Sequence, residues 1–195
     1  MSKEGKTGVS ANTPKNIMFG AGTIHKGLKY TSNAWNFDST IVGATSGGSK
    51  LSIVPEITNI EVDGALVKAK GLTVKTGETA SMEINFIELT KDIIKTATIG
   101  TDGTSDDATN YDVIESKANI ATGDYWENIA FVGKTLEGKN IIAIMDNALC
   151  TSGFEQEGKN KEGAVGKYTF ECHADLTSDL DKLPWHIYYP KASEI

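Results

Sequence analysis

The alternation of apolar and polar residues in segment 80–87 constrains the fold of this chain more than any other feature. Apolar side chains occupy every second position, at Ala80, Met82, Ile84 and Phe86. Because successive side chains of a β-strand point to opposite faces, this period of two predicts a strand with one buried and one exposed face. A half-buried strand of this kind implies a sheet that covers a core.

Short apolar runs separated by turn-forming residues recur along the rest of the chain. Strands are expected around 111–116, 125–133, 140–149, 165–176 and 185–189, and the second and third of these carry apolar residues on both faces. Two short strands within 16–27 are expected to pair as a hairpin, and Asp63-Gly64 is a strong two-residue turn signal. We therefore predict a mainly β protein, organised as a sandwich or barrel.

One short helix is expected at about residues 89–98. Thr90 is a suitable N-cap, Asp92 complements the dipole in the first turn, and Gly100 can end the helix. Its apolar stripe consists of Leu89, Ile93, Ile94 and Ala97. The helix is expected to pack against one edge or opening of the sheet assembly.

The chain of 195 residues is long enough for one sizeable domain with extended arms. Residues 1–14 are small and polar without periodicity, which predicts an N-terminal arm that is disordered in the isolated subunit. Residues 15–190 are expected to form a single β-rich domain, followed by a C-terminal tail at 191–195. Because no apolar run approaches the ~20 residues of a membrane span, and no signal peptide is recognisable, we expect synthesis in the cytoplasm and no membrane partner.

Residues 36–55 form the candidate interaction site. The strand-like runs STIV and KLSIV flank Gly43–Gly48, which are turn-formers with almost no side chain to bury. This pattern predicts a long hairpin whose tip has no core of its own and needs a partner subunit to cover it. The residues assigned to this inter-subunit hairpin are Ile41, Val42, Gly43, Ala44, Thr45, Ser46, Gly47, Gly48, Lys50 and Leu51.

The charge composition argues against specific binding of nucleic acid. The formal net charge is −7, and all 19 basic residues are lysine. Arginine is the preferred residue for bidentate contacts to phosphates and base edges, so its absence from an acidic chain favours a surface past which DNA slides.

The sequence contains no recognisable catalytic or metal-binding motif. Cys150 and Cys172 lack CxxC spacing and are expected to be buried free thiols. In a strand, Cys172 and His173 point to opposite faces, so they cannot share a metal ion. The acidic loop at 102–107 lacks the residue order of a calcium loop, and Gly43–Gly48 lacks the Lys-Ser/Thr ending of a phosphate loop. We expect no catalytic residue, no metal and no cofactor, and hence not an enzyme.

Three stretches form a pattern that extends over nearly the whole chain. They are NIMFGAGTI at 16–24; GATSGG at 43–48 with IVPEI at 53–57 and VDG at 62–64; and FECHAD at 170–175 with LDKLPWHIYYP at 180–190. Together they resemble the major tail (tail tube) proteins of phages that infect Gram-positive bacteria. The strand followed by a helix at 80–97 also lies where that family has its single helix.

The resemblance implies a fold of the tail-tube type and a structural role in the virion tail. Six subunits would join their sheets into a ring with a continuous inner β-barrel, and stacked rings would form the hollow tube through which phage DNA passes. The 36–55 hairpin would match the loop that contacts neighbouring subunits, and the terminal arms would mediate stacking. Partners implied are copies of the chain, tape-measure, tail terminator and baseplate or tip proteins, and a sheath where the tail is contractile.

Alternatives remain open at this point. The tail could be contractile or sheathless, and the particle a phage or a tail-like bacteriocin. The chain could instead be an enzyme whose site no motif reveals, or another virion or surface β-module, such as a capsid decoration or a carbohydrate-binding domain. In the latter, Trp35, Trp126 and Trp185 would be candidate sugar platforms, against the simpler interpretation that they pack in a core or interface.

Overall fold

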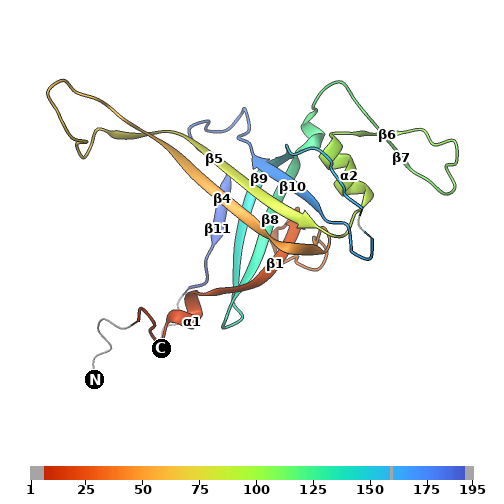
Figure 1. The fold of residues 1–195 in the computed structure, drawn as a ribbon, viewed down its shortest axis with the longest axis horizontal. Coiled ribbons are helices and arrows are strands. Elements are labelled where there is room, and N and C mark those ends of the chain that lie inside the picture. The colour runs from red at the N-terminus through yellow and green to blue at the C-terminus, as the bar shows by residue number, and fades with distance from the viewer. Residues whose placement is uncertain (1–6, 159, 192–195) are drawn as a thin grey trace.

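The computed structural model describes residues 7–158 and 160–191 and is mainly β, as predicted. The strands are β1 (Met18–Lys26), β2 (Tyr30–Thr31), β3 (Ala34–Trp35), β4 (Thr45–Asn59), β5 (Thr73–Phe86), β6 (Thr101–Gly103), β7 (Val113–Glu115), β8 (Trp126–Thr135), β9 (Asn140–Cys150), β10 (Gly166–Cys172) and β11 (Trp185–Tyr188). The α-helices are α1 (Thr13–Asn16) and α2 (Lys91–Thr98), with a 3₁₀ turn at Thr122–Asp124. Figure 1 shows their arrangement around one large sheet.

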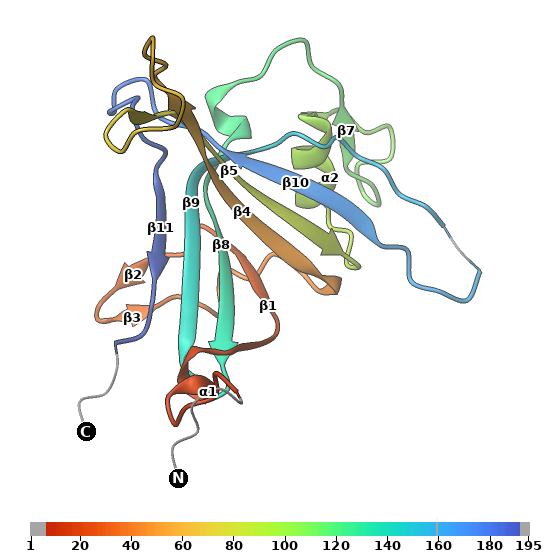
Figure 2. The ribbon, with the colours of Figure 1, turned by 60° about the vertical axis from the view of Figure 1, so that its left-hand side comes forward.

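The large sheet is antiparallel and forks at β9. Its strands follow the order β1-β8-β9-β10-β5-β4, and β11 also pairs with β9. On the side opposite β8, β9 pairs with β10 at residues 148–150 and with β11 at residues 142–145. As a result, the β10-β5-β4 part and β11 leave β9 in different directions (Figure 2). The pairs β2-β3 and β6-β7 are separate two-stranded sheets.

The main core lies between the sheet and α2. Ala80, Met82, Ile84 and Phe86 of β5 are all buried, which confirms the predicted half-buried strand. Helix α2 buries Ile93 and Ala97 against the same core. Apolar residues repeat every 2 positions in the strand and about every 3.6 positions in the helix. Each element therefore has one apolar face, which it buries against the core.

A second cluster covers the opposite face of β8 and β9. It consists of Leu28, Ala130, Val132, Ile142 and Ile144, with Trp35 and Phe37 packed against it. The prediction that these two strands are covered on both sides is therefore confirmed. The β2-β3 hairpin supplies the cover, and Trp35 meets Tyr188 of β11 edge to face with ring centroids 5.0 Å apart.

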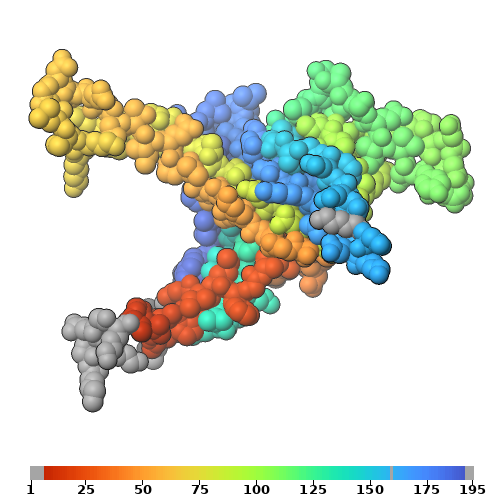
Figure 3. All heavy atoms as spheres, in the orientation of Figure 1, coloured from red at the N-terminus to blue at the C-terminus, as the bar shows by residue number. Residues whose placement is uncertain are grey.

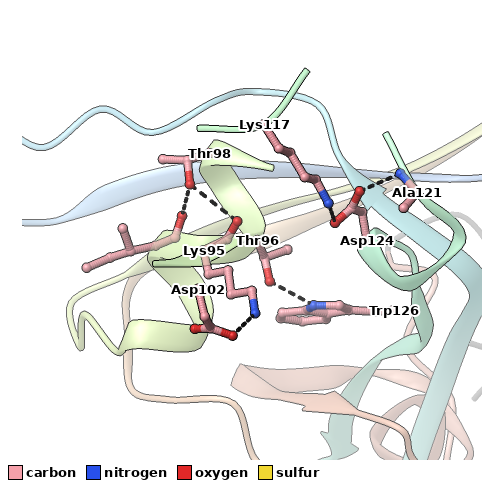
Figure 4. Close-up of polar contacts among 9 residues, drawn as sticks. Lys95, Thr96, Thr98, Asp102, Lys117, Ala121, Asp124 and Trp126 are labelled. Atoms are coloured by element: carbon pink, nitrogen blue, oxygen red, sulfur yellow. Dashed lines mark hydrogen bonds and ion pairs between the residues drawn. The ribbon is translucent and has the colours of Figure 1, made fainter. Parts of the chain in front are cut away.

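Helix α2 begins as the sequence predicted. The Thr90 hydroxyl accepts a hydrogen bond from the backbone N–H of Ile93 at 3.3 Å, which caps the first turn. At the other end Ile99, not Gly100, takes the left-handed conformation (φ 50°). The indole N–H of Trp126 donates to the Thr96 hydroxyl at 3.0 Å and so ties the helix to β8 (Figure 4).

The N-terminal third departs from the prediction in more than one element. Residues 16–27 do not form a hairpin; instead, β1 is one strand that pairs with β8 and contains a register shift between Phe19 and Thr23. Gly20 and Gly22 have φ values of 92° and 71° there, so the glycines make a bulge and not a turn.

The predicted arms at 1–14 and 191–195 lie partly outside the described residues. Within those residues, no helix has the length and apolar character needed to cross a bilayer.

Candidate assembly interface

The longest projection of the molecule is the outer half of the β4-β5 hairpin. Strand β10 pairs with β5 only along residues 81–86, so the ribbon beyond Ile53 and Ala80 has no third strand. We call residues 54–79 the arm, and residues 60–72, which connect its strands, the arm tip. Figure 1 shows the arm extending away from the sheet as a two-stranded ribbon. Such ribbons are marginally stable in water unless another surface covers them.

The arm carries several exposed apolar side chains. Those with at least two fifths of their surface exposed are Val54, Ile57, Ile60, Val62, Leu66, Val67 and Val74. Leu66 is 98% exposed and Val67 is 81% exposed, although neither is charged or polar. Several exposed apolar side chains on one projection typically mark an interaction site.

The predicted Asp63-Gly64 turn is present in the arm tip. Gly64 has φ 83°, and the N–H of Ala65 donates to the carbonyl of Val62 at 3.0 Å. The signal for this hairpin was therefore available in the sequence. The length of the hairpin was not predicted. Residues 65–72 form no strand, and β5 begins at Thr73 and pairs with β4 from there.

The predicted hairpin at 36–55 is wrong. Residues 40–42 pair with β1: the N–H of Val42 donates to the carbonyl of Ile24 at 3.0 Å, and the N–H of Lys26 donates to the carbonyl of Thr40 at 2.8 Å. The second run, from Thr45 onward, belongs to β4 and pairs with β5. Gly47 and Gly48, with φ values of 83° and 84°, form an irregularity inside β4.

The ten residues assigned to that hairpin consequently lie in three different settings. Ile41 is exposed beside β1, while Val42 packs against the main core. Ala44 is held at the end of β5, where its N–H donates to the Glu88 carboxylate at 2.9 Å. The rest, Gly43, Thr45, Ser46, Gly47, Gly48, Lys50 and Leu51, lie at or within the base of β4. They do not form a common projecting tip.

The face of β4, β5 and β10 that points away from the core is polar. Glu83 lies at its centre, within 3.3 Å of the Lys50 ammonium group and 2.5 Å of the Lys167 ammonium group. The hydrogen bonds from Lys167 and then Lys50 hold the pKa of Glu83 below its usual value. By strand alternation Glu56 and Glu171 share this face, which gives it more carboxylates than lysines.

The tryptophans do not form an exposed platform. Trp126 is only 4% exposed and packs on Phe170 with ring centroids 4.7 Å apart. Trp35 and Trp185 are half-buried, against the second cluster and the main core respectively. Trp126 is therefore a core residue and cannot stack on a sugar.

The residues considered for metal binding lie apart. The Cys172 thiol is buried and donates to the carbonyl of Asp146 at 3.3 Å, whereas the His173 ring bonds the carbonyl of Glu171 at 3.0 Å. Across residues 7–158 and 160–191, no cluster of three or more His, Cys, Asp and Glu side chains could hold a metal ion.

Comparison with known proteins adds no assignment. No protein-family model matches the chain, and a search of curated proteins gives no significant match. The likeness to tail tube proteins therefore rests on the sequence pattern, and the interface described above rests on the geometry of the arm.

Proposed function

We propose that this chain is a structural subunit that assembles with copies of itself into stacked hexameric rings, which form the hollow tail tube of a phage-type particle. The observation that supports this most directly is the arm, a two-stranded ribbon with exposed apolar residues and no core of its own. A partner surface is needed to remove those residues from water.

The sheet edges support the same conclusion. β4 is one of the two terminal strands of the large sheet, with β1 at the other end, and among the described residues β11 pairs with β9 alone, so β4 and β11 both present backbone groups that a neighbouring strand can use. Pro55 lies in β4, where prolines are tolerated because the edge needs no donor. Joining edges of successive copies into a closed ring satisfies these groups without open-ended aggregation.

The polar face of β4, β5 and β10 is the proposed channel lining. It lies opposite the face that packs against α2, so joining the sheets edge to edge turns one side inward and keeps the helix outside. The excess of carboxylates over lysines on this face would repel DNA phosphates and allow passage without binding. The N- and C-terminal segments would mediate stacking of the rings, and tape-measure, terminator and baseplate or tip proteins would be further partners, as the resemblance implies.

Electron microscopy of the purified protein over a wide concentration range tests this function. We expect rings or tubes of uniform diameter, with sedimentation that becomes faster as concentration rises. A shortened arm, in which residues 60–72 are replaced by Asn-Gly, should fold normally and assemble poorly. A protein that stays monomeric at every concentration and ionic strength would contradict the proposal.

A further inference from the structure

Segment 65–71 of the arm tip combines positive charge with exposed apolar side chains. It contains Lys68 and Lys70 but no acidic residue, and it includes the highly exposed Leu66 and Val67, whereas Glu61 and Asp63 of the tip precede this segment. Neither lysine takes part in an ion pair with any residue that the structure describes. The segment is therefore a basic and apolar surface suited to an acidic partner.

A matching acidic surface lies in the β6-β7 hairpin. Its connecting loop, residues 104–112, contains Asp106, Asp107 and Asp112 and no lysine. Asp106 and Asp107 are exposed, and Tyr111 beside them is 69% exposed. The Asp107 carboxylate accepts hydrogen bonds from Asn110 at 3.0 Å, which shapes the loop without neutralising its charge.

The base of this hairpin is anchored, but its end is not neutralised. The Lys91 ammonium group lies 3.1 Å from both Asp102 and Asp112, and Lys95 also binds Asp102 (Figure 4). Helix α2 therefore fixes the hairpin to the main core. The lysines of α2 contact the carboxylates nearest the base, and Asp106 and Asp107 take part in no ion pair within the described chain.

The two surfaces cannot meet within one subunit. The arm tip and the β6-β7 hairpin lie at opposite ends of the longest axis of the molecule, as Figures 1 and 3 show. A surface at one end that complements a surface at the other end produces a heterologous, head-to-tail contact between copies. The occupant that the chain itself provides is thus a second copy of the same chain.

We propose that the arm tip of one copy docks on the 104–112 loop of the next copy, with Lys68 and Lys70 facing Asp106 and Asp107. Leu66 and Val67 pack against Tyr111 in this contact. The inference rests on the proposed self-assembly and specifies which surfaces carry it. Since exposed ion pairs add little affinity, the apolar contact supplies most of the stability, and the charges select the partner and its orientation.

Charge exchange tests this contact. The double variants Lys68→Glu/Lys70→Glu and Asp106→Lys/Asp107→Lys each place like charges opposite one another, and each should raise the concentration needed for assembly about tenfold or more at low salt. Combining all four substitutions in one chain restores opposite charges and should return that concentration towards the wild-type value. Salt at ~1 M should reduce the differences. Assembly is measured by sedimentation velocity, and folding by circular dichroism.

A matched control removes two lysines elsewhere. The variant Lys134→Glu/Lys182→Glu has the same net charge as the arm-tip variant and should assemble as the wild type does. If the wild type assembles and either double reversal does so at the same concentration, the inference is overturned while the proposed function stands. The inference is also overturned if the combined variant fails to recover or the control is weakened equally. A wild type that never assembles overturns both.

Discussion

The Nδ1 atom of His25 lies 2.9 Å from the Oγ1 atom of Thr40, and this hydrogen bond joins β1 to residues 40–42, which precede β4. The Thr40 hydroxyl donates its own proton to the carbonyl of Asn36 at 2.8 Å. Because a hydroxyl has a single proton to donate, Nδ1 of His25 must be the donor in this pair. Burial lowers the pKa of His25 and so favours the neutral ring, whose Nε2 atom accepts from the Thr23 hydroxyl at 2.8 Å.

Removing the Thr40 hydroxyl should destabilise the fold. The substitution Thr40→Val keeps the shape of the side chain but removes the hydroxyl that accepts from the buried Nδ1–H of His25, which costs about 1–3 kcal/mol. Urea unfolding of the subunit measures the loss. Thr31→Val, on the exposed β2 strand, is the matched control and should change the stability by less than ~0.5 kcal/mol. Equal stability of the two variants would show that the hydrogen bond between His25 and Thr40 contributes nothing to the free energy of unfolding.

The same histidine predicts a loss of stability in mild acid. Burial lowers the pKa of His25 below 6.5, so the unfolded chain takes up a proton before the folded chain does as the pH falls. Its contribution is therefore present above about pH 6.5 and is lost as the pH falls through the folded pKa. Asp38 and Lys134 line the cavity beside the ring. The difference in unfolding free energy between pH 7.5 and 5.5 should be smaller for His25→Gln than for the wild type; an unchanged difference would contradict this.

Elements with a local apolar period could be predicted from the sequence, and elements defined by distant pairing could not. The buried half of strand β5 and helix α2 were predicted closely, because the side chains of Met82 and Ile93 repeat with the period of their own element. The prediction of a 36–55 hairpin was wrong, because glycine at positive φ serves equally in a turn and in a bulge, as at Gly47. The fork at β9 depends on pairing between residues 20 or more positions apart, as in Cys150 with Phe170 and Ile144 with His186.

The sequence predicted the type of the candidate interface, a hairpin without a core, but not its position in the chain. The sequence pattern predicted a long hairpin without a core, and such a hairpin exists about 20 residues further along the chain, at the arm. The turn at Asp63-Gly64 was predicted, but not that β10 stops short of residues 73–79 and leaves the arm without a third strand. Only the paired register of β5 and β10 reveals that.

The bulge in β1 predicts different costs for two neighbouring glycines. Both Gly20 and Gly22 have positive φ, so alanine at either site costs about 1–2 kcal/mol in backbone strain. A Cβ atom at Gly22 would also lie 2.5 Å from the Phe131 ring and 2.9 Å from the Val132 carbonyl oxygen, whereas at Gly20 it meets nothing within 4 Å. Gly22→Ala should therefore cost a further ~1–3 kcal/mol in urea unfolding. Equal losses would show that the ring moves aside freely.

Both cysteines should be unreactive in the folded subunit. Burial, with the nearby charge of Asp146 adding to it, raises the pKa of Cys172 to about 12, and burial also raises the pKa of Cys150. Since the thiolate is the reactive form, a disulfide reagent at pH 8 should modify neither thiol within the time in which free cysteine reacts fully. Both should react once the chain is unfolded in denaturant. A fast-reacting thiol in the native protein would contradict their burial.

The polar face of β4, β5 and β10 gives a prediction for assembled tubes. The substitutions Glu56→Lys and Glu171→Lys replace two of the three carboxylates that we assign to this face. Glu83 then remains beside Lys50, Lys167 and the two new lysines, so the face becomes basic. If the face lines the channel, tubes of this variant should retain short double-stranded DNA at low salt and release it as salt rises, because retention would depend on phosphate contacts. Wild-type tubes should retain none.

The control for this prediction carries the same change of net charge on other surfaces. Glu137→Lys and Glu155→Lys lie in exposed loops outside strands β4, β5 and β10. Tubes of that variant present the added lysines outside the proposed channel, where nuclease added to the mixture reaches any bound DNA. DNA held by the Glu56/Glu171 variant should resist digestion, since the channel wall shields it, and DNA held by the control should not. Equal sensitivity in both would place the polar face on the outside of the assembly and refute its role as the lining.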